Sequence, residues 1–349
     1  MTTPNYFYFL LYFLLYCLYL YSFVIMPVTM PKNSCAVALL ACSSYEQPKL
    51  SQSLDKVLDL SPISPLSLCS AQVLLKPNLI SAKTGPLACT EGAFILAVAK
   101  RFIDQGAKVS LGDSPAFGTT TSVLNNLNLL EELARLGVQI RSFTQGVSVN
   151  LPNGNRATLA RAALECDLLV NMPRVKAHAQ ARLTMAVKNY FGCLIGLRKA
   201  WWHMAYGGGK KMSHEKKGFF DRLVQFPAAL PPAINLVDGI TAMHISGPLD
   251  GRPYPLSVLG AATNAVAVDR AFHAILGVTP QDSPLMAACQ RAKLAGAKFS
   301  QLSFPLSCPA DLEVNDFQVP GELNPVRFNL FRFFKSSIRR FFLSLNRPM

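Results

Sequence analysis

The chain has 349 residues, of which 50% are hydrophobic and 15% charged, so it can bury a sizeable core and is not a disordered chain. Its formal net charge of +14 is confined to two stretches: residues 171–217 carry ten basic residues and one acid, and residues 325–349 carry six and none. The rest of the chain holds 18 basic and 19 acidic residues, which argues against a general polyanion-binding surface and makes nucleic acid an unlikely partner.

The N-terminal region, residues 1–33, is expected to be an apolar segment outside the folded domain. Its stretch from Tyr6 to Met26 has 21 residues without a charge, which is long enough to cross a bilayer. No basic residue precedes this stretch, so a cleavable signal peptide is not expected. Two interpretations remain open: a membrane anchor, or a mis-called start upstream of a true first residue at Met26 or Met30.

Apolar runs of strand length alternate with helical stretches along the next 200 residues or so. Several runs are apolar throughout, as expected of strands covered on both faces. One helix is predicted between an N-cap at Thr90 and a stop at Gly106, and another over 119–137. The turn Asn153-Gly154 predicts a hairpin over 148–159. The predicted strands are 35–41, 71–77, 108–113, 138–143, 167–172 and 233–239.

This order of elements predicts an α/β fold: a doubly wound, mainly parallel sheet flanked by helices, with a small antiparallel insertion. The folded domain is expected to span residues 34–322. A glycine- and lysine-rich loop is expected over 205–218.

The C-terminal region, residues 323–349, is predicted to be a basic amphipathic tail. Apolar side chains recur there at spacings of three and four, from Phe331 to Leu345, with Arg332, Lys335 and Arg339 among the basic residues between them. Residues 326–349 would then either contact an anionic membrane surface through the aromatic side or dock on the domain.

Polar residues follow several of the predicted strands, where ligands of doubly wound sheets bind. Lysines there suit a carboxylate or a phosphate, and a histidine can move a proton near neutral pH. The two aspartates are either acid/base groups or turn residues. The catalytic candidates are His178, Lys176, Asp113 and Asp238. The ligand-binding candidates are Lys76, Asn78, Ser114, Asn171, Arg174, Lys188 and Asn189.

Nine cysteines are scattered along the chain without a CxxC pair or a regular framework. This scatter indicates reduced thiols and a cytoplasmic location, and the chain has no iron–sulfur motif. HExxH, GxSxG, GxxxxGK(S/T) and GxGxxG motifs are also missing from the sequence. The sequence therefore predicts no metal site and leaves the cofactor unknown.

Five segments taken in order resemble the family called domain of unknown function 362: LLKPNLI, GDSPAFG, DLLVNMPRVKAHAQARLTMAVKNYFGCLIG, INLVDGITAMHISGPLDGRP and AVAVDRAFHAILG. The resemblance runs from about Cys35 to Gly321, and it favours the mis-called start because family members usually begin close to the first strand. Two positions depart from the family motifs: Ala177 replaces a threonine, and His244 replaces an acidic residue.

The resemblance implies little about activity. Many family members occur with iron–sulfur ferredoxin modules, which suggests redox work and, for this chain, a separate ferredoxin-like partner. Two hypotheses follow. The first is a redox-associated enzyme acting on an anionic small molecule. The second is a non-catalytic module that binds a ligand or redox partner at a membrane surface.

Overall fold

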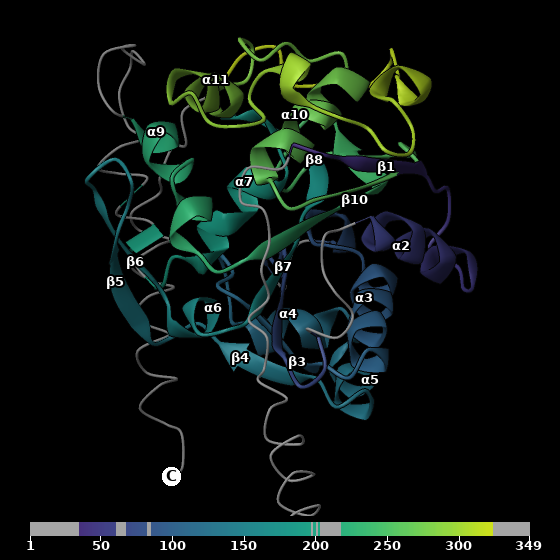
Figure 1. Ribbon diagram of the computed structural model, residues 1–349, viewed down its shortest axis with the longest axis vertical. Helices are drawn as coiled ribbons and strands as arrows, with labels where there is room; N and C mark the ends of the chain where they lie inside the picture. The colour runs from purple at the N-terminus through teal and green to yellow at the C-terminus, as the bar shows by residue number, and fades with distance from the viewer. Residues whose placement is uncertain are drawn as a thin grey trace, which may run out of the picture.

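A computed structural model describes residues 35–60, 68–81, 85–196, 198–199, 202 and 218–323. They form one ten-stranded mixed sheet, flanked by helices, and a separate two-stranded sheet (Figure 1). The predicted α/β fold with a mainly parallel sheet is confirmed. The apolar N-terminal segment, the loop over 205–217 and the amphipathic tail lie outside the described residues.

The main path of the sheet runs in the order β1-β12-β10-β7-β2-β3-β4. Neighbours from β10 to β4 are parallel, whereas β12 is antiparallel to both β1 and β10. The strands predicted from apolar runs are all present, and β10 is five residues longer than predicted. The bounds are β1 (Ala38–Ala41), β2 (Gln72–Pro77), β3 (Lys108–Asp113), β4 (Gln139–Ser142), β7 (Leu168–Met172), β10 (Ala233–His244) and β12 (Val258–Ala262).

Three short strands extend the sheet beside β10. β8 (Arg174–His178) pairs with β10 and with β9 (Arg182–Thr184), and β11 (Arg252–Tyr254) pairs with the end of β10. The predicted hairpin is the separate sheet of β5 (Gly146–Asn150) and β6 (Arg156–Ala160). None of β8, β9, β11 and β12 was predicted, because they are short or lie beyond the periodic part of the sequence.

Helices cover both faces of the sheet, which explains why its strands are apolar throughout. On β2, for example, Leu74 packs into one core while Val73 and Leu75 pack into the other. One face is covered by α2 (Lys49–Asp59), α3 (Gly92–Asp104), α4 (Thr120–Asn126) and α5 (Leu130–Arg135). The other is covered by α6 (Arg161–Leu164), α7 (Ala186–Asn189), α9 (Phe219–Leu223), α10 (Ala265–Ile275) and α11 (Pro284–Arg291).

Two helix predictions need correction. The region over 119–137 is two helices, α4 and α5, because Asn128 adopts a left-handed conformation with φ of 56° that an α-helix excludes. Thr90 does not cap α3, whose N-cap is Glu91. The Thr90 hydroxyl instead donates to the Met172 carbonyl at 2.6 Å and accepts from the Asn78 N–H at 2.8 Å. It thus ties the loop after β2 to the end of β7.

Glycines on β10 and β12 let α10 approach the sheet closely. A Cβ added at Gly260 would lie 2.5 Å from the ring of Phe272, and one at Gly239 would lie 3.0 Å from the same ring. Phe272 is fully buried on α10, so its ring has little room to move. The sequence of these strands therefore fixes how near the helix can lie.

We expect Gly260→Ala to lower the free energy of unfolding by about 1–3 kcal/mol, because the added methyl group overpacks against Phe272. The matched control is Gly85→Ala, where nothing lies within 4 Å of an added Cβ, and its effect should stay within about 0.5 kcal/mol. Urea unfolding of both variants measures the difference. Equal stabilities of the two variants would contradict this account of the packing.

Candidate functional site

The site begins where two neighbouring parallel strands, β2 and β3, end. Lys76 Nζ donates to Asp113 Oδ1 at 2.8 Å, and the two side chains are 0% and 3% exposed. The other carboxylate oxygen of Asp113 accepts the Leu79 N–H at 2.8 Å. Lys76 Nζ also donates to the Pro77 carbonyl at 3.1 Å and to Asn189 Oδ1 at 3.3 Å. Three acceptors match the three N–H donors of an ammonium group, so this buried charge is fully compensated.

A chain of buried amides joins this ion pair to the centre of the sheet. Asn189 Nδ2 donates to Asn171 Oδ1 at 2.8 Å, and Asn171 Nδ2 donates to Asn235 Oδ1 at 2.9 Å. Asn171 and Asn235 face each other in the parallel register of β7 and β10. Tyr190 OH also donates to Asn235 Oδ1, at 2.8 Å. The chain of amides therefore holds α7, which carries Asn189, against the strand ends.

A buried carboxylate on α10 supports α7 from the opposite side. Asp269 Oδ1 accepts the Ala186 N–H at 2.7 Å, and Asp269 Oδ2 accepts the Val187 N–H at 3.1 Å. Burial raises the pKa of Asp269 to about 7, although both N–H groups favour the ionised form. These bonds position the two residues that follow, Lys188 and Asn189.

Four lysines interact electrostatically with one another or with Asp113, and we call Lys76, Lys176, Lys188 and Lys199 the lysine cluster. The amino groups of Lys188 and Lys199 lie 5.2 and 6.0 Å from the centre of the Phe191 ring. Lys199 Nζ donates to the Ser114 carbonyl. The segments that bring these lysines together are β2, β8, α7 and the chain after η3 (Tyr190–Cys193).

The pKa values of three lysines in the cluster are lowered. Burial and, to a lesser extent, the charge of Lys76 lower the pKa of Lys188 to about 8. Burial also lowers the pKa of Lys199 to about 7; Asp113 opposes this shift and Lys76 adds to it. For Lys176 the pKa falls to about 7, mainly through burial and with the charges of Arg174 and Lys188 contributing. The ammonium groups of the cluster are poorly solvated and repel one another as like charges.

Gly192, in η3, lies directly against the ion pair. A Cβ added there would collide with Asp113 Oδ1 and with Lys76 Nζ. Only a residue without a side chain lets the backbone of η3 approach the pair so closely.

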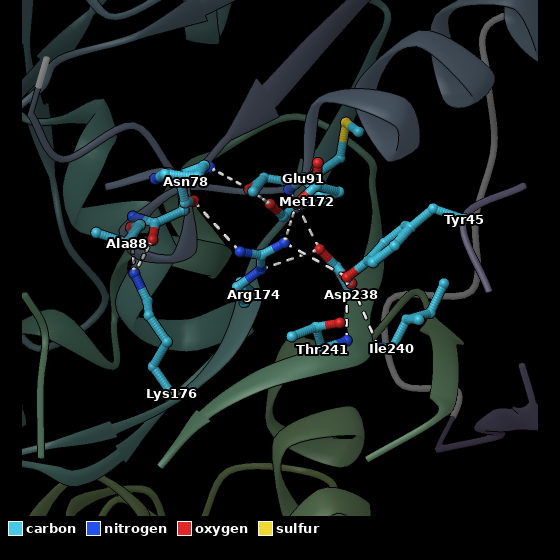
Figure 2. A network of polar contacts seen from close by, with 12 residues as sticks. Tyr45, Asn78, Ala88, Glu91, Met172, Arg174, Lys176, Asp238, Ile240 and Thr241 are labelled. Atoms are coloured by element: carbon cyan, nitrogen blue, oxygen red, sulfur yellow. Dashed lines mark hydrogen bonds and ion pairs between the residues drawn. The ribbon is translucent and has the colours of Figure 1, made fainter. Parts of the chain in front are cut away.

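A second polar group, the arginine cluster, consists of Arg174, Asp238, Glu91 and Tyr45 (Figure 2). Arg174 Nε donates to Asp238 Oδ2 at 3.3 Å, and its Nη2 donates to Glu91 Oε2 at 2.8 Å. Its Nη1 donates to the Pro86 carbonyl at 3.3 Å, and Tyr45 OH donates to Asp238 Oδ1 at 2.7 Å. Burial by itself would lower the pKa of Arg174, but Asp238, Tyr45 and Glu91 together raise it above its usual value.

The two clusters meet at β8. Arg174 and Lys176 lie two residues apart on this strand, so their side chains leave its same face. Lys176 Nζ donates to Asn78 Oδ1 and, at 2.9 Å, to the Ala88 carbonyl (Figure 2). Arg174 is therefore held by two carboxylates, whereas Lys176 is held by neutral oxygens alone among the contacts of the described residues.

The structure distributes the candidate residues as follows. It gathers Lys76, Asn78, Asp113, Asn171, Lys176, Lys188 and Asn189 at or beside the lysine cluster, and it puts Arg174 and Asp238 in the arginine cluster. Ser114 contributes its backbone carbonyl. His178 takes part in a local turn, in which its Nδ1 accepts the Gln180 N–H at 3.1 Å. The catalytic and binding roles of these residues stay predictions.

Several residues of the site were missed by sequence reasoning: Tyr45, Glu91, Gly192, Lys199, Asn235 and Asp269. Asn235 carried a usable signal, since it is a polar residue inside an apolar strand. Tyr45 carried none, because it meets Asp238 from 193 residues away. Within the described ranges, no group of three or more His, Cys, Asp or Glu side chains is arranged to hold a metal ion. Over the same ranges no helix is long and apolar enough to span a membrane.

Comparison with known protein families identifies the family of this chain. Residues 73–274 match the model of the family described as Domain of unknown function (DUF362). The chain belongs to this family. The match covers Lys76, Asp113, Lys176 and Asp238, so both clusters lie largely within the family domain.

Two individual proteins were compared with this DUF362 chain. The "Thylakoid-associated protein sll1697" of Synechocystis sp. (strain ATCC 27184 / PCC 6803 / Kazusa) is 35% identical over 311 residues, which is 88% of this chain and 95% of that protein. The solved lactate racemase apoprotein of Thermoanaerobacterium thermosaccharolyticum superposes with a TM-score of 0.38 at 13% identity, over 60% of this chain and 52% of that one.

We expect Arg174→Ala to lower the free energy of unfolding by about 3–5 kcal/mol, because it leaves the buried Asp238 carboxylate without its cation. The control is Arg135→Ala, which removes an arginine that is 65% exposed in a surface ion pair and should cost less than about 1 kcal/mol. Chemical unfolding at pH 7 measures both. A loss for Arg174→Ala no larger than that for Arg135→Ala would show that the arginine cluster does not stabilise the fold.

Proposed function

We propose that this protein binds a small molecule carrying a carboxylate or phosphate group at the lysine cluster. The observation that carries the proposal is that four lysines interact within one cluster that holds a single carboxylate, Asp113, which already pairs with Lys76. The other three amino groups have no acidic partner among the ion pairs of the described residues. An anion placed beside Lys188 and Lys199 would supply the missing negative charge.

The electrostatics of the cluster favour a ligand of this kind. Burial is the main cause of the lowered pKa values of Lys176, Lys188 and Lys199, and repulsion from neighbouring cations adds to it. A bound anion would raise these pKa values again, so binding should be coupled to proton uptake. Lysine ammonium groups act as point charges, which suits phosphate and carboxylate alike.

We expect the affinity for sulfate to fall as the pH rises from 6 to 9. The amino groups of Lys188 and Lys199 are charged below their pKa values of about 8 and about 7, and they lose their charge as the pH rises through this range. Each proton taken up on binding makes the dissociation constant rise up to about tenfold per pH unit above the pKa. Titration calorimetry measures this, because sulfate keeps its charge throughout. An affinity independent of pH would contradict the proposed site.

Lys188→Gln should weaken sulfate binding at pH 6.5 by about tenfold, because it removes one charged hydrogen bond to the anion. Lys100→Gln is the control, since Lys100 is 64% exposed in a surface pair with Asp104 and should leave binding unchanged. Equal binding by Lys188→Gln and the unaltered protein would remove Lys188 from the site.

Anion binding at the lysine cluster is compatible with two forms of the protein. The first is a redox-associated enzyme, and the second is a non-catalytic binding module. The redox association and the ferredoxin-like partner rest on the family resemblance alone. The second form is supported by the name of the Synechocystis relative, which describes that protein as thylakoid-associated. The basic and aromatic pattern of residues 326–349 is the part of this chain that suits such an association.

We expect a chain truncated after residue 325 to lose binding to vesicles that contain anionic lipid, because the tail carries six basic residues, four of which lie between its phenylalanines. Sedimentation of the full-length and truncated proteins with anionic and neutral vesicles measures the difference. Sulfate binding by the truncated protein should be retained and serves as the control. Unchanged vesicle binding after truncation would remove the tail from the proposal.

A further inference from the structure

Lys76 and Lys176 differ in how many hydrogen bonds their amino groups make. Lys76 Nζ has three acceptors, one of which is the Asp113 carboxylate. Lys176 Nζ has two acceptors within the described part of the chain, Asn78 Oδ1 and the Ala88 carbonyl. Both of these oxygens are neutral. The environment of Lys76 thus fits a charged ammonium group, with three donors.

The environment of Lys176 fits the uncharged amine. A neutral amine has two N–H donors and one lone pair, and the two acceptors take both donors. The lone pair is then left for another partner. The side chain is 3% exposed, so solvent does little to stabilise its charged form. The pKa of about 7 agrees with this assignment. The charged or titratable groups that act on it are Cys89, Arg174, Lys188 and Asp113.

The neighbouring Lys188 differs from Lys176 in a useful way. Burial lowers the pKa of Lys188 to about 8 and that of Lys176 to about 7, so Lys188 holds its proton more readily than Lys176 does. One lysine can therefore hold an anionic group while the other presents a nucleophile beside it. A lysine whose pKa is depressed by burial and by neighbouring cations is a recognised form of activated amine.

We propose that Lys176 is a catalytic amine that forms a Schiff base with a small aldehyde or ketone bearing a carboxylate or phosphate group, which Lys188 holds. This proposal rests on the proposed function, since the anionic group is bound by the lysine cluster. It adds the substrate class and the covalent step.

The step is balanced without any further reactant. The lone pair of Lys176 Nζ attacks the carbonyl carbon, forming a C–N bond while the C=O π electrons move to oxygen. The carbonyl oxygen then leaves as water with the two protons of the amine, and a C=N bond remains. Protonation of this imine gives a cation that donates one hydrogen bond, for which the Asn78 and Ala88 oxygens are already in place.

Reductive trapping tests the proposal. The full-length protein is incubated with pyruvate and sodium borohydride at pH 7.5 and digested, and the modified lysines are mapped by mass spectrometry. We expect the adduct at Lys176 to exceed that at the exposed Lys100 by at least about tenfold, because a lysine with an ordinary pKa is almost entirely protonated at this pH. Modification of Lys176 no greater than that of Lys100 would overturn the proposal.

Two controls make the result specific. Lys176→Gln is uncharged like the neutral amine and removes the nucleophile, so the peptide that contains residue 176 should carry no adduct while surface lysines are unchanged. If this variant does not fold, sulfate competition on the unaltered protein decides, since excess sulfate should suppress the adduct at Lys176 and not at Lys100. Trapping at Lys176 that sulfate leaves unaffected would overturn the role of Lys188.

The outcomes also separate this proposal from the proposed function. Sulfate binding without an adduct at Lys176 would leave the anion site intact and overturn the Schiff base. An adduct with the neutral ketone acetone equal to that with pyruvate, and no sulfate binding, would overturn the anion site. Dihydroxyacetone phosphate in a parallel reaction distinguishes a phosphate-bearing substrate from a carboxylate-bearing one, and the greater adduct identifies the class.

Discussion

The ion pair between Lys76 and Asp113 is the contact on which the rest of the site depends. It closes the carboxyl ends of β2 and β3, and both of its members are almost fully buried. A buried charge is tolerated only with a partner and with its remaining hydrogen-bonding positions filled. Asn189 from α7 fills one of these positions, and Gly192 lets the backbone of η3 lie against the pair. This salt bridge therefore acts together with Asp269 and the chain of buried amides to position the segment that carries Lys188.

The two polar clusters solve the problem of buried charge differently. In the arginine cluster one guanidinium group pairs with two carboxylates, and each of the three guanidinium nitrogens of Arg174 donates a hydrogen bond. Such a group stabilises one arrangement of the loops that supply Tyr45, Pro86 and Glu91. The lysine cluster has an excess of amino groups over carboxylates, and three of its pKa values fall towards neutrality. Chemistry is expected at the cluster whose charges are not compensated within the described chain.

The predictions from sequence were most accurate where the pattern was local. The apolar runs that became β2, β3 and β7 were placed almost to the residue, because burial on both faces leaves a continuous apolar signature. The single helix predicted over 119–137 is interrupted at Asn128. This residue adopts a left-handed conformation, which helix propensity does not predict. The sequence predicts Thr90 as a helix cap, but its hydroxyl bridges Asn78 and Met172, which are neighbours only in three dimensions.

The sequence by itself determined the α/β sheet, the family and the gathering of polar side chains at the strand ends, because these follow from periodicity and from motifs of a few consecutive residues. Only the tertiary structure decided which of those charges are neutralised. Arg174 and Lys176 look alike in the sequence, two residues apart on one strand. Arg174 meets Asp238 and Glu91 through space, and Lys176 meets two neutral oxygens. Since pKa depends on such partners, the difference in their chemistry exists only in the folded chain.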